Sequence, residues 1–332
     1  MSERNTPNIY DIAERAGVSI ATVSRVLSGS DKVRETTRKR VMAVIEETGY
    51  TPNPFARGLG LGSMKMVGIL CTDVSDLYYA AAISALERLL RRSGFDMLLY
   101  CTGDSLTDKK RYMGFLLEKH VDAIILVGSA FKEQDDNTHI ENAAANVPVI
   151  IINGLVECPG VYCVLCDEKQ AMYDNVGYLY ASGRRRMLYL YDALTFSGMQ
   201  KLDGFKTAHC DLGMAPDEAL IIRCKRDIPS VRALVADMIC HGPAFDAVLA
   251  AEDILSIGVC KALAEAGVDV PVIGFNNSIL AQCATPELTS VDNRVAKLCA
   301  AAATMLEGLL EKRSDVPSKL ILEAKLVRRS TF

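Results

Sequence analysis

The chain has 332 residues, of which 50% are hydrophobic and 23% are charged. This length predicts two or three domains, and the composition excludes a disordered, collagen-like or low-complexity chain. The formal net charge of -4, taken over the whole chain, argues against a nucleic-acid-binding protein.

Nothing in the sequence points to a membrane or to secretion. No apolar run approaches the roughly 18 residues that a membrane span needs, and residues 1–8 form no signal peptide. The 11 cysteines are scattered through apolar segments, which is typical of a protein in a reducing cytosol. We therefore expect a cytoplasmic protein with no membrane partner.

Metal-binding and catalytic motifs are also missing from the sequence. Cys163 and Cys166, with Cys158 nearby, would supply half of a zinc site, but no second pair completes it. The four histidines lie in unrelated contexts, and no P-loop, G-x-S-x-G or H-E-x-x-H motif occurs. We expect no bound metal, no cofactor and no enzymatic activity.

Charge is distributed unevenly along the chain. Residues 1–63 contain 9 Lys and Arg against 7 Asp and Glu, a balance of +2. Residues 64–332 contain 28 basic and 34 acidic residues, a balance of -6. Four basic side chains gather around the start of one expected helix: Arg34, Arg38, Lys39 and Arg40. Because a basic cluster is usually a solvated face, it indicates nucleic acid only beside a motif.

Such a motif precedes the cluster. Apolar residues at helical spacing predict a helix over Ile9–Ala16, with Asn8 as its N-cap. Gly17 ends this helix and supplies the turn to a second helix over Ile20–Leu27. A third helix is expected over Glu35–Thr48. Two short helices joined by a glycine-containing turn form a helix-turn-helix.

The two sides of this unit differ in chemistry. The expected contacts between its helices are apolar and come from Ile12, Ala13, Ala16, Val18, Val23 and Val26. The outward positions on the second helix, which Ser19 would cap, are small, polar or basic: Ser19, Ile20, Ala21, Thr22, Ser24 and Arg25. Such a surface suits the major groove of DNA. A three-helix module that binds another protein would have the same pattern, and both interpretations stay open on pattern alone.

The segments Tyr10–Ser19 and Thr22–Leu27 resemble the head of the lactose/galactose repressor (LacI/GalR) family, and Thr37–Val41 and Gly49–Asn53 continue the match. The resemblance implies a DNA-binding head over residues 1–51. It places Ile20 and Ala21 against base edges and Arg25 against bases or phosphates. It also implies DNA contacts from Arg34, Thr37, Arg38 and Tyr50. Because Arg34 stands where relatives often have a capping Ser, the third helix is expected to be capped differently and Arg34 to reach a phosphate.

Residues 52–63 correspond to the family's hinge helix. In the family this helix forms when two protomers pair over the operator, and the resemblance gives Asn53, Arg57 and Leu59 contacts with DNA, with Leu59 as a minor-groove wedge. Gly58 and Gly60 each disfavour a helix by about 1 kcal/mol relative to Ala. A flexible linker is therefore the alternative interpretation of this segment.

From Met66 onward, short apolar strands alternate with helices, which predicts parallel sheets covered on both faces. One helix is expected over Tyr79–Arg92 and another through Tyr112–Leu117. Strands are expected over Val67–Cys71, Met97–Tyr100, Ala123–Val127 and Val149–Ile152. The pattern restarts at Tyr162–Leu165 and continues at Leu188–Tyr191, Leu220–Arg223, Ala247–Ala250 and Val272–Phe275.

The predicted fold is thus an all-α helix-turn-helix head followed by an α/β core of two doubly wound parallel-sheet subdomains. The family shares this core architecture with periplasmic sugar-binding proteins. The core is expected over residues 64–332. By resemblance, one subdomain takes about 64–164 and 293–321, and the other takes about 165–292 and 322–332.

Ligands bind open parallel sheets at the carboxyl ends of the strands, so residues just after the strands should line a cleft. The candidate loops include Leu194–Phe196 and Glu252–Asp253. The full set of expected effector-binding residues is Asp73, Ser75, Tyr78, Tyr79, Ser129, Asn153, Asp167, Phe196, Lys201, Asp253 and Asn276. Any one of them could instead serve its own loop, as when Asp253 caps a helix.

Two of these positions depart from the family. Lys201 stands where the family has a ligand-anchoring Arg, and Lys lacks the bidentate guanidinium fork. Asn276 replaces the usual Asp, so an acceptor-only carboxylate becomes an amide. These changes leave room for an effector other than a simple hexose.

Together these features predict a homodimeric transcription regulator, most simply a repressor, which binds operator DNA and responds to a small, sugar-like effector. The dimer surface is expected on the core, near helix Tyr79–Leu90. The alternative is a regulator that answers to a partner protein or to a non-sugar effector such as a nucleobase. A pure solute-binding protein would share the core but would lack residues 1–60.

Overall fold

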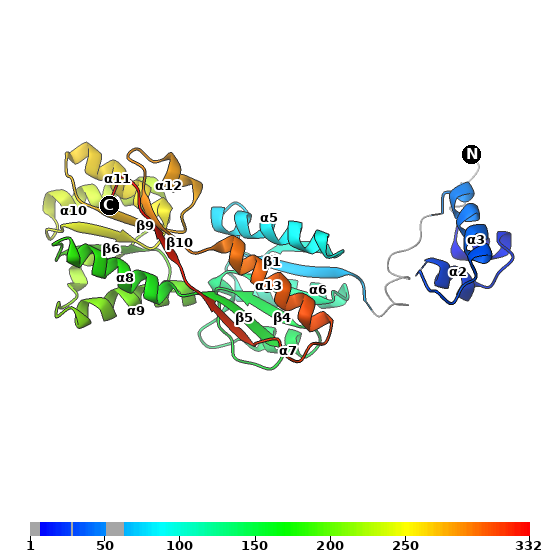
Figure 1. Cartoon of the computed structure of the whole chain (residues 1–332). Helices are drawn as coiled ribbons and strands as arrows, with labels where there is room; N and C mark the ends of the chain where they lie inside the picture. The colour runs from blue at the N-terminus through cyan, green and yellow to red at the C-terminus, as the bar shows by residue number, and fades with distance from the viewer. Residues whose placement is uncertain (1–6, 28, 51–62) are drawn as a thin grey trace. The chain divides into compact units, whose positions relative to one another are not determined.

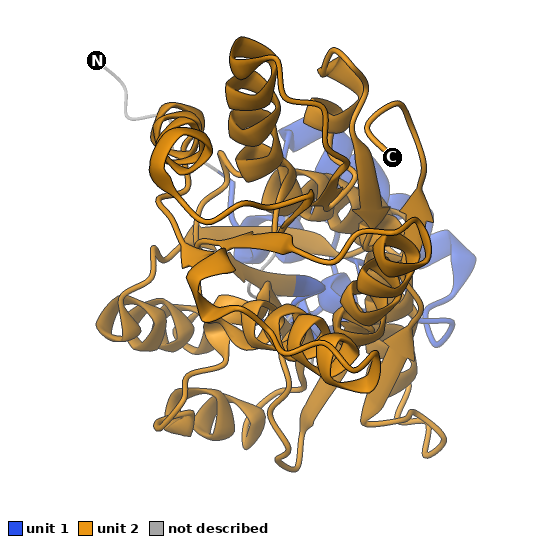
Figure 2. Ribbon diagram, turned by 90° about the vertical axis from the view of Figure 1, so that its left-hand side faces the viewer, with its two compact units in different colours: residues 1–66, 120–122 blue, residues 67–119, 123–332 orange. Residues whose placement is uncertain are grey.

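A computed structural model describes residues 7–27, 29–50 and 63–332. Contacts divide the chain into two compact units, residues 1–66 with 120–122 and residues 67–119 with 123–332 (Figure 2). We call residues 7–50 the head and residues 67–332 the core. Most of the expected hinge, with Asn53, Arg57 and Leu59, lies outside the described residues.

The head contains the three expected helices, α1 (Ile9–Arg15), α2 (Ile20–Leu27) and α3 (Glu35–Thr48). The side chain of Asn8 accepts hydrogen bonds from the backbone N–H groups of Tyr10 and Asp11, at 2.8 and 3.2 Å. The carboxylate of Asp11 accepts one from the N–H of Asn8 at 2.8 Å, which completes a capping box. Gly17 has a φ of +61°, the left-handed conformation that the turn between α1 and α2 needs.

The apolar sides of the three helices pack together into one small core. Its fully or nearly fully buried members are Ile12, Ala13, Ala16, Val23, Val26 and Val41. Five of the six expected contact residues are among them, and the sixth, Val18, is partly buried. The helical fold of the head is therefore confirmed.

The core contains two six-stranded sheets (Figure 1). The first has the order β11 (Lys319–Leu322), β5 (Val161–Cys166), β4 (Val149–Ile152), β3 (Ala123–Val127), β1 (Met66–Cys71), β2 (Asp96–Cys101). Helices α5 (Leu77–Arg92) and α13 (Val295–Leu310) cover one face of this sheet, and α6 (Leu106–Glu118) and α7 (Thr138–Ala144) cover the other.

The second sheet has the order β12 (Lys325–Val327), β10 (Thr289–Asp292), β9 (Val272–Phe275), β8 (Ala247–Ala250), β6 (Met187–Tyr191), β7 (Ile221–Arg223). Its faces are covered by α8 (Glu168–Ala181) with α9 (Phe196–Asp211) and by α10 (Ile228–His241) with α11 (Asp253–Ala266). Short elements are η1 (Ser129–Phe131), η2 (Glu218–Leu220) and α12 (Ile279–Cys283). Successive residues of β6 point to opposite faces of the second sheet and pack into different apolar clusters, so both faces of this sheet are apolar.

The two doubly wound subdomains are confirmed, with two differences from the expected pattern. The apolar pattern was expected to restart at Tyr162–Leu165, but this strand, β5, continues the first sheet, where it pairs with β4 and β11. The three final strands were not predicted, and β12 pairs antiparallel with β10. Only Glu323 and Ala324 separate β11 from β12, so the chain passes from the edge of the first sheet to the edge of the second within two residues.

The chain passes between the two sheets three times: after β5, after β10 and after β11. The expected crossings near Leu165, Asn293 and Leu322 lie at these places. The loops at the carboxyl ends of β1, β3, β6 and β8 all contribute to one hollow, which is described below.

Candidate functional site

The outward surface of α2 has the residues that the sequence predicted. Ser19, Ile20, Ala21, Ser24 and Arg25 are exposed, and the side chain of Ile20 is large and apolar. Thr22 is half-buried, and its hydroxyl lies 2.9 Å from that of Ser19. Ser19 also accepts a hydrogen bond from the N–H of Thr22 at 3.2 Å, so it caps α2 as expected.

The start of α3 has Arg34 at the position of a capping Ser. Arg34 occupies the N-cap position without any side-chain cap hydrogen bond, and its side chain is exposed. The guanidinium of Arg38 instead turns inward and donates to the carbonyl oxygens of Ser30 and Val26, at 2.7 and 3.4 Å. Arg38 therefore fixes the loop between α2 and α3. Thr37 and Tyr50 are half-buried.

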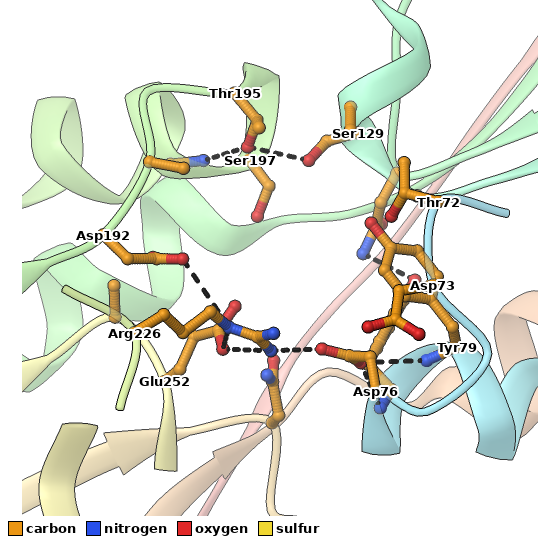
Figure 3. Close-up of a pocket in the computed structure, with 18 of the residues that line it drawn as sticks. Thr72, Asp73, Asp76, Tyr79, Ser129, Asp192, Thr195, Ser197, Arg226 and Glu252 are labelled. Atoms are coloured by element: carbon orange, nitrogen blue, oxygen red, sulfur yellow. Dashed lines mark hydrogen bonds and ion pairs between the residues drawn. The ribbon is translucent and has the colours of Figure 1, made fainter. Parts of the chain in front are cut away.

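A polar cleft of about 510 Å³ lies between the two subdomains of the core (Figure 3). Seven of the expected effector-binding residues line it: Asp73, Tyr78, Tyr79, Ser129, Asn153, Lys201 and Asn276. They come from both subdomains, as expected for loops at the carboxyl ends of the strands. The remaining four lie elsewhere.

Ser75 and Asp253 line a second hollow that shares several residues with the first. Asp253 is buried, and its carboxylate accepts hydrogen bonds from the N–H and hydroxyl of Ser278 and from the hydroxyl of Ser290, at 2.6, 2.7 and 2.5 Å. Its role in the structure is thus to hold the loop after β9. Asp167 and Phe196 line neither hollow, because Asp167 caps α8 and Phe196 begins α9.

One arginine connects the two sides of the cleft. Arg226, in the loop after β7, donates to the carboxylate of Glu252 at 2.6 Å and lies 3.6 Å from that of Asp192. Its other end forms an ion pair with Asp76, which belongs to the first subdomain and caps α5 (Figure 3). A second bridge joins the hydroxyls of Ser129 and Thr195 at 2.9 Å.

The acidic groups around Arg226 perturb each other. Burial and the nearby carboxylate of Asp192 raise the pKa of Glu252 to about 7, although Arg226 and Lys201 act in the opposite direction. Burial lowers the pKa of Arg226, but the carboxylates of Glu252 and Asp76 raise it further, so it lies above its usual value. The guanidinium therefore stays charged, and its Nε and one terminal nitrogen contact protein carboxylates.

Lys201 is buried at the floor of the cleft. Its ammonium donates to the carbonyl oxygen of Ala251 at 3.1 Å and lies 3.9 Å from the carboxylate of Glu168. It also lies 4.1 Å from the centre of the Phe275 ring, a cation–π contact. The other carboxylate oxygen of Glu168 accepts a hydrogen bond from Ser197.

Two tyrosines pack on the first-subdomain side. Burial raises the pKa of Tyr79 to about 12, and its ring lies over Gly128, where a Cβ atom would lie 2.4 Å from it. The hydroxyl of Tyr78 accepts a hydrogen bond from the amide of Asn153 at 3.2 Å. Both phenols thus stay neutral and give the cleft an aromatic wall.

Sequence reasoning missed part of the lining: Thr72, Asp76, Asp104, Asp192, Ser197 and Arg226. The signal that could have found several of them was available, because Thr72 and Asp192 directly follow β1 and β6, and Asp104 and Arg226 follow β2 and β7 by three residues. What the sequence does not show is that Arg226 pairs with carboxylates of both subdomains.

The described part of the chain offers neither a metal site nor a membrane span. No group of three or more His, Cys, Asp or Glu side chains within residues 7–27, 29–50 and 63–332 could hold a metal ion. Over that same part of the chain, no helix is both long and apolar enough to cross a membrane.

Comparison with known proteins agrees with this architecture. Residues 8–53 match the family of bacterial regulatory proteins of the LacI type, and residues 64–321 match the periplasmic binding proteins and sugar binding domain of the LacI family. A transcriptional regulator of Lachnoclostridium phytofermentans is 45% identical over 98% of this chain and 99% of its own. The regulator AscG of Escherichia coli is 31% identical, with 98% of each chain covered.

Solved structures give the same result. A complex of the regulator CelR with cellobiose is 27% identical, covers 98% of this chain and 100% of its own, and has a TM-score of 0.72. A lac repressor dimer bound to operator has a TM-score of 0.88 over 98% and 99% of the two chains, and at 23% identity it shows the fold alone. The protein therefore belongs to the LacI family of DNA-binding transcriptional regulators, with a helix-turn-helix head and a periplasmic-binding-protein-like sugar-binding domain.

Proposed function

We propose that the protein is a repressor that binds a pseudo-palindromic operator as a homodimer in the cytoplasm. Its affinity for the operator decreases or increases when a small effector binds in the cleft. The observation that carries this proposal is the cleft itself, because ion pairs and hydrogen bonds from both subdomains meet in it. An effector with different affinities for the open and closed cleft would shift the equilibrium between them, and the linkage to operator binding is reciprocal.

The head supports a specific manner of DNA contact. Ile20 and Ala21 are exposed at the start of α2, where apolar side chains favour a thymine methyl group over bidentate hydrogen bonds. Arg34 has no cap hydrogen bond to make and extends from the start of α3, which suits a phosphate contact. Arg38 acts by positioning, since its guanidinium is used within the head.

Several of the proposed DNA contacts are inferred from the sequence resemblance to the family. Thr37 and Tyr50 are half-buried near the surface of the head, and Arg25 is exposed on α2. The contacts assigned to Asn53, Arg57 and Leu59, with Leu59 as a minor-groove wedge, remain proposals for a hinge outside the described residues.

The dimer surface is proposed on the first subdomain, although most apolar residues of α5 serve another purpose. Ala82, Ile83, Ala85, Leu86 and Leu90 are buried among the residues that pack α5 against the first sheet and α13. Exposed positions of the same helix, such as Leu77 and Ala81, would supply the contact instead. Sedimentation with and without operator would measure the oligomeric state.

The charge of the cleft favours an uncharged, sugar-like effector. Its lining contains six carboxylates, Asp73, Asp76, Asp104, Glu168, Asp192 and Glu252, against the two cations Lys201 and Arg226. Both cations already have protein partners. A phosphorylated or acidic ligand would meet net negative charge, whereas hydroxyl groups could donate to the carboxylates and exchange hydrogen bonds with the amides of Asn153 and Asn276.

A thermal-shift experiment tests this assignment. We expect cellobiose or another neutral sugar to raise the melting temperature of the core, and glucose 6-phosphate to have no effect. Replacing Lys201 by Met should abolish the shift, whereas Lys206→Met, on the exposed side of the same helix, should preserve it. A response to adenine alone would replace the sugar by a nucleobase, and a response to no small molecule would favour a partner protein.

Operator binding is tested separately. Selection from genomic DNA fragments should enrich one palindromic sequence that the head recognises, and Ile20→Ala should change the preferred base at one position of each half-site. Binding without sequence preference, with and without sugars, would refute the repressor.

A further inference from the structure

Two cysteine thiols meet where β1 and β2 end. Cys71 is the last residue of β1 and Cys101 the last residue of β2, and these strands are neighbours in the first sheet. The backbone N–H groups of Thr102 and Gly103 donate to the carbonyl oxygens of Cys71 and Thr72, at 2.9 and 3.0 Å. The two cysteines are therefore in register, and their Sγ atoms lie 3.6 Å apart.

The two thiols have different surroundings. Cys101 is exposed, whereas Cys71 is completely buried in the hydrophobic core beneath α5. Burial and the neighbouring thiol raise the pKa of Cys71 to about 12. All 11 cysteines belong to the part of the chain that the structure describes, and among them no other two side chains form a thiol–thiol contact.

We propose that Cys71 and Cys101 are a site of reversible oxidation, at which a peroxide converts the thiol pair into an intrachain disulfide. Peroxide from the solvent reaches Cys101, whose thiolate attacks it. Cys71 lies close enough to react with the oxidised Cys101 and form the disulfide. The oxidation itself requires neither DNA nor the effector proposed above.

The chemistry balances with hydrogen peroxide as the oxidant. The thiolate of Cys101 attacks one peroxide oxygen, the O–O bond breaks, and Cys101 becomes a sulfenic acid while one water leaves after protonation. Cys71 then attacks the sulfenic sulfur, loses its proton, and displaces the hydroxyl group as a second water. Two thiols and one peroxide thus give one disulfide and two waters.

The geometry allows the bond with a local movement. Neighbouring strands lie about 4.8 Å apart, which is inside the range of about 4.4–6.8 Å between Cα atoms that disulfides span. The sulfurs must approach from 3.6 Å to about 2.05 Å, by side-chain rotation and a shift of the edge strand β2.

The bond would form directly beside the cleft. Thr72 and Asp73 follow Cys71, Gly103 and Asp104 follow Cys101 by two and three residues, and all four line the cleft. Linking the two strand ends would therefore restrict the backbone that carries one wall of it. A disulfide that is open to solvent on one side is also of the readily reduced kind, which fits a reversible modification.

Peptide mapping of the full-length protein tests the site. We expect brief treatment with hydrogen peroxide, followed by alkylation of free thiols, to give a cross-linked peptide pair that contains Cys71 and Cys101, about tenfold more abundant than any other cysteine pair. Dithiothreitol should remove it. In the oxidised protein, hydrogen exchange at Thr102 and Gly103 should be slower, because the strand ends are tied together.

Two serine variants provide the comparison. Cys101→Ser changes an exposed side chain, so it should fold normally, lose the cross-link and show no change in hydrogen exchange on oxidation. Cys210→Ser, an equally exposed cysteine on α9, should retain both effects. Oxidation of Cys101 to a sulfinic acid without a cross-link, or cross-links spread evenly over unrelated cysteines or between chains, would overturn the proposal.

Discussion

The carboxylate of Glu252 reduces the stability of the folded core at neutral and alkaline pH, and Glu252→Gln should remove this cost. Glu252 lies 2.6 Å from Arg226 and is only 21% exposed, and burial beside Asp192 raises its pKa from the usual 4.5 to about 7. Gln has the same shape and can still accept a hydrogen bond from Arg226 through its amide oxygen.

The direction of the effect follows from which state holds the proton. Below pH 4.5 Glu252 is protonated in both the folded and the unfolded chain, so its pKa difference costs nothing. Between pH 4.5 and about 7 the unfolded chain ionises first, and the folded state loses stability as the pH rises. Above pH 7 the full cost is present.

The magnitude is set by the size of the pKa change. A rise from 4.5 to about 7, at about 1.4 kcal/mol per pH unit, corresponds to about 3 kcal/mol. Water that enters the cleft reduces this figure, so we expect Glu252→Gln to raise the free energy of unfolding by about 2 kcal/mol at pH 8. Well below pH 4.5, where both states are protonated, the variant and the wild type should have equal stability.

Urea unfolding of the core at several pH values measures this difference. The surface variant Glu265→Gln serves as the control, because its ion pair with Arg232 is 52% exposed on both sides and contributes little. Our reasoning is refuted if Glu252→Gln is less stable than the wild type at pH 8, or if the difference does not vary with pH.

Three further substitutions give sharp outcomes. Arg226→Met leaves the facing carboxylates unneutralised, so the cleft should open and the radius of gyration measured by X-ray scattering should rise. The control Arg232→Met should leave the radius of gyration unchanged. An unchanged radius in both variants would contradict the role of Arg226 in joining the two subdomains. Ile12→Ala should lower the free energy of unfolding of the head by about 3 kcal/mol and abolish operator binding, while the melting temperature of the core is unchanged. Wild-type operator affinity would show that the head does not depend on its own buried apolar residues. Arg34→Ala should lower the magnitude of the slope of log affinity against log salt by about two, one for each protomer of the dimer, and an unchanged slope would exclude its phosphate contact.

Local chemistry determined the head. The capping box of Asn8 and Asp11, the left-handed Gly17 and the cap from Ser19 all act within three or four residues, so the sequence predicts α1 and α2 with nearly the observed bounds. Runs of buried apolar residues likewise predicted the strands at the centre of each sheet, because a strand covered on both faces must be apolar throughout.

Long-range pairing decided what the sequence missed. The last three strands are short and lack that apolar signal, because β11 and β12 are partly exposed and β10 is buried but mostly polar. They are recognisable only by the sheets that they join. The cleft followed in outline from the rule that ligands meet the carboxyl ends of strands. Its pairings did not, because Arg226 reaches Asp76 across 150 positions of the chain. The thiol contact of Cys71 with Cys101 likewise depends on the register of two strands, which only the folded sheet fixes.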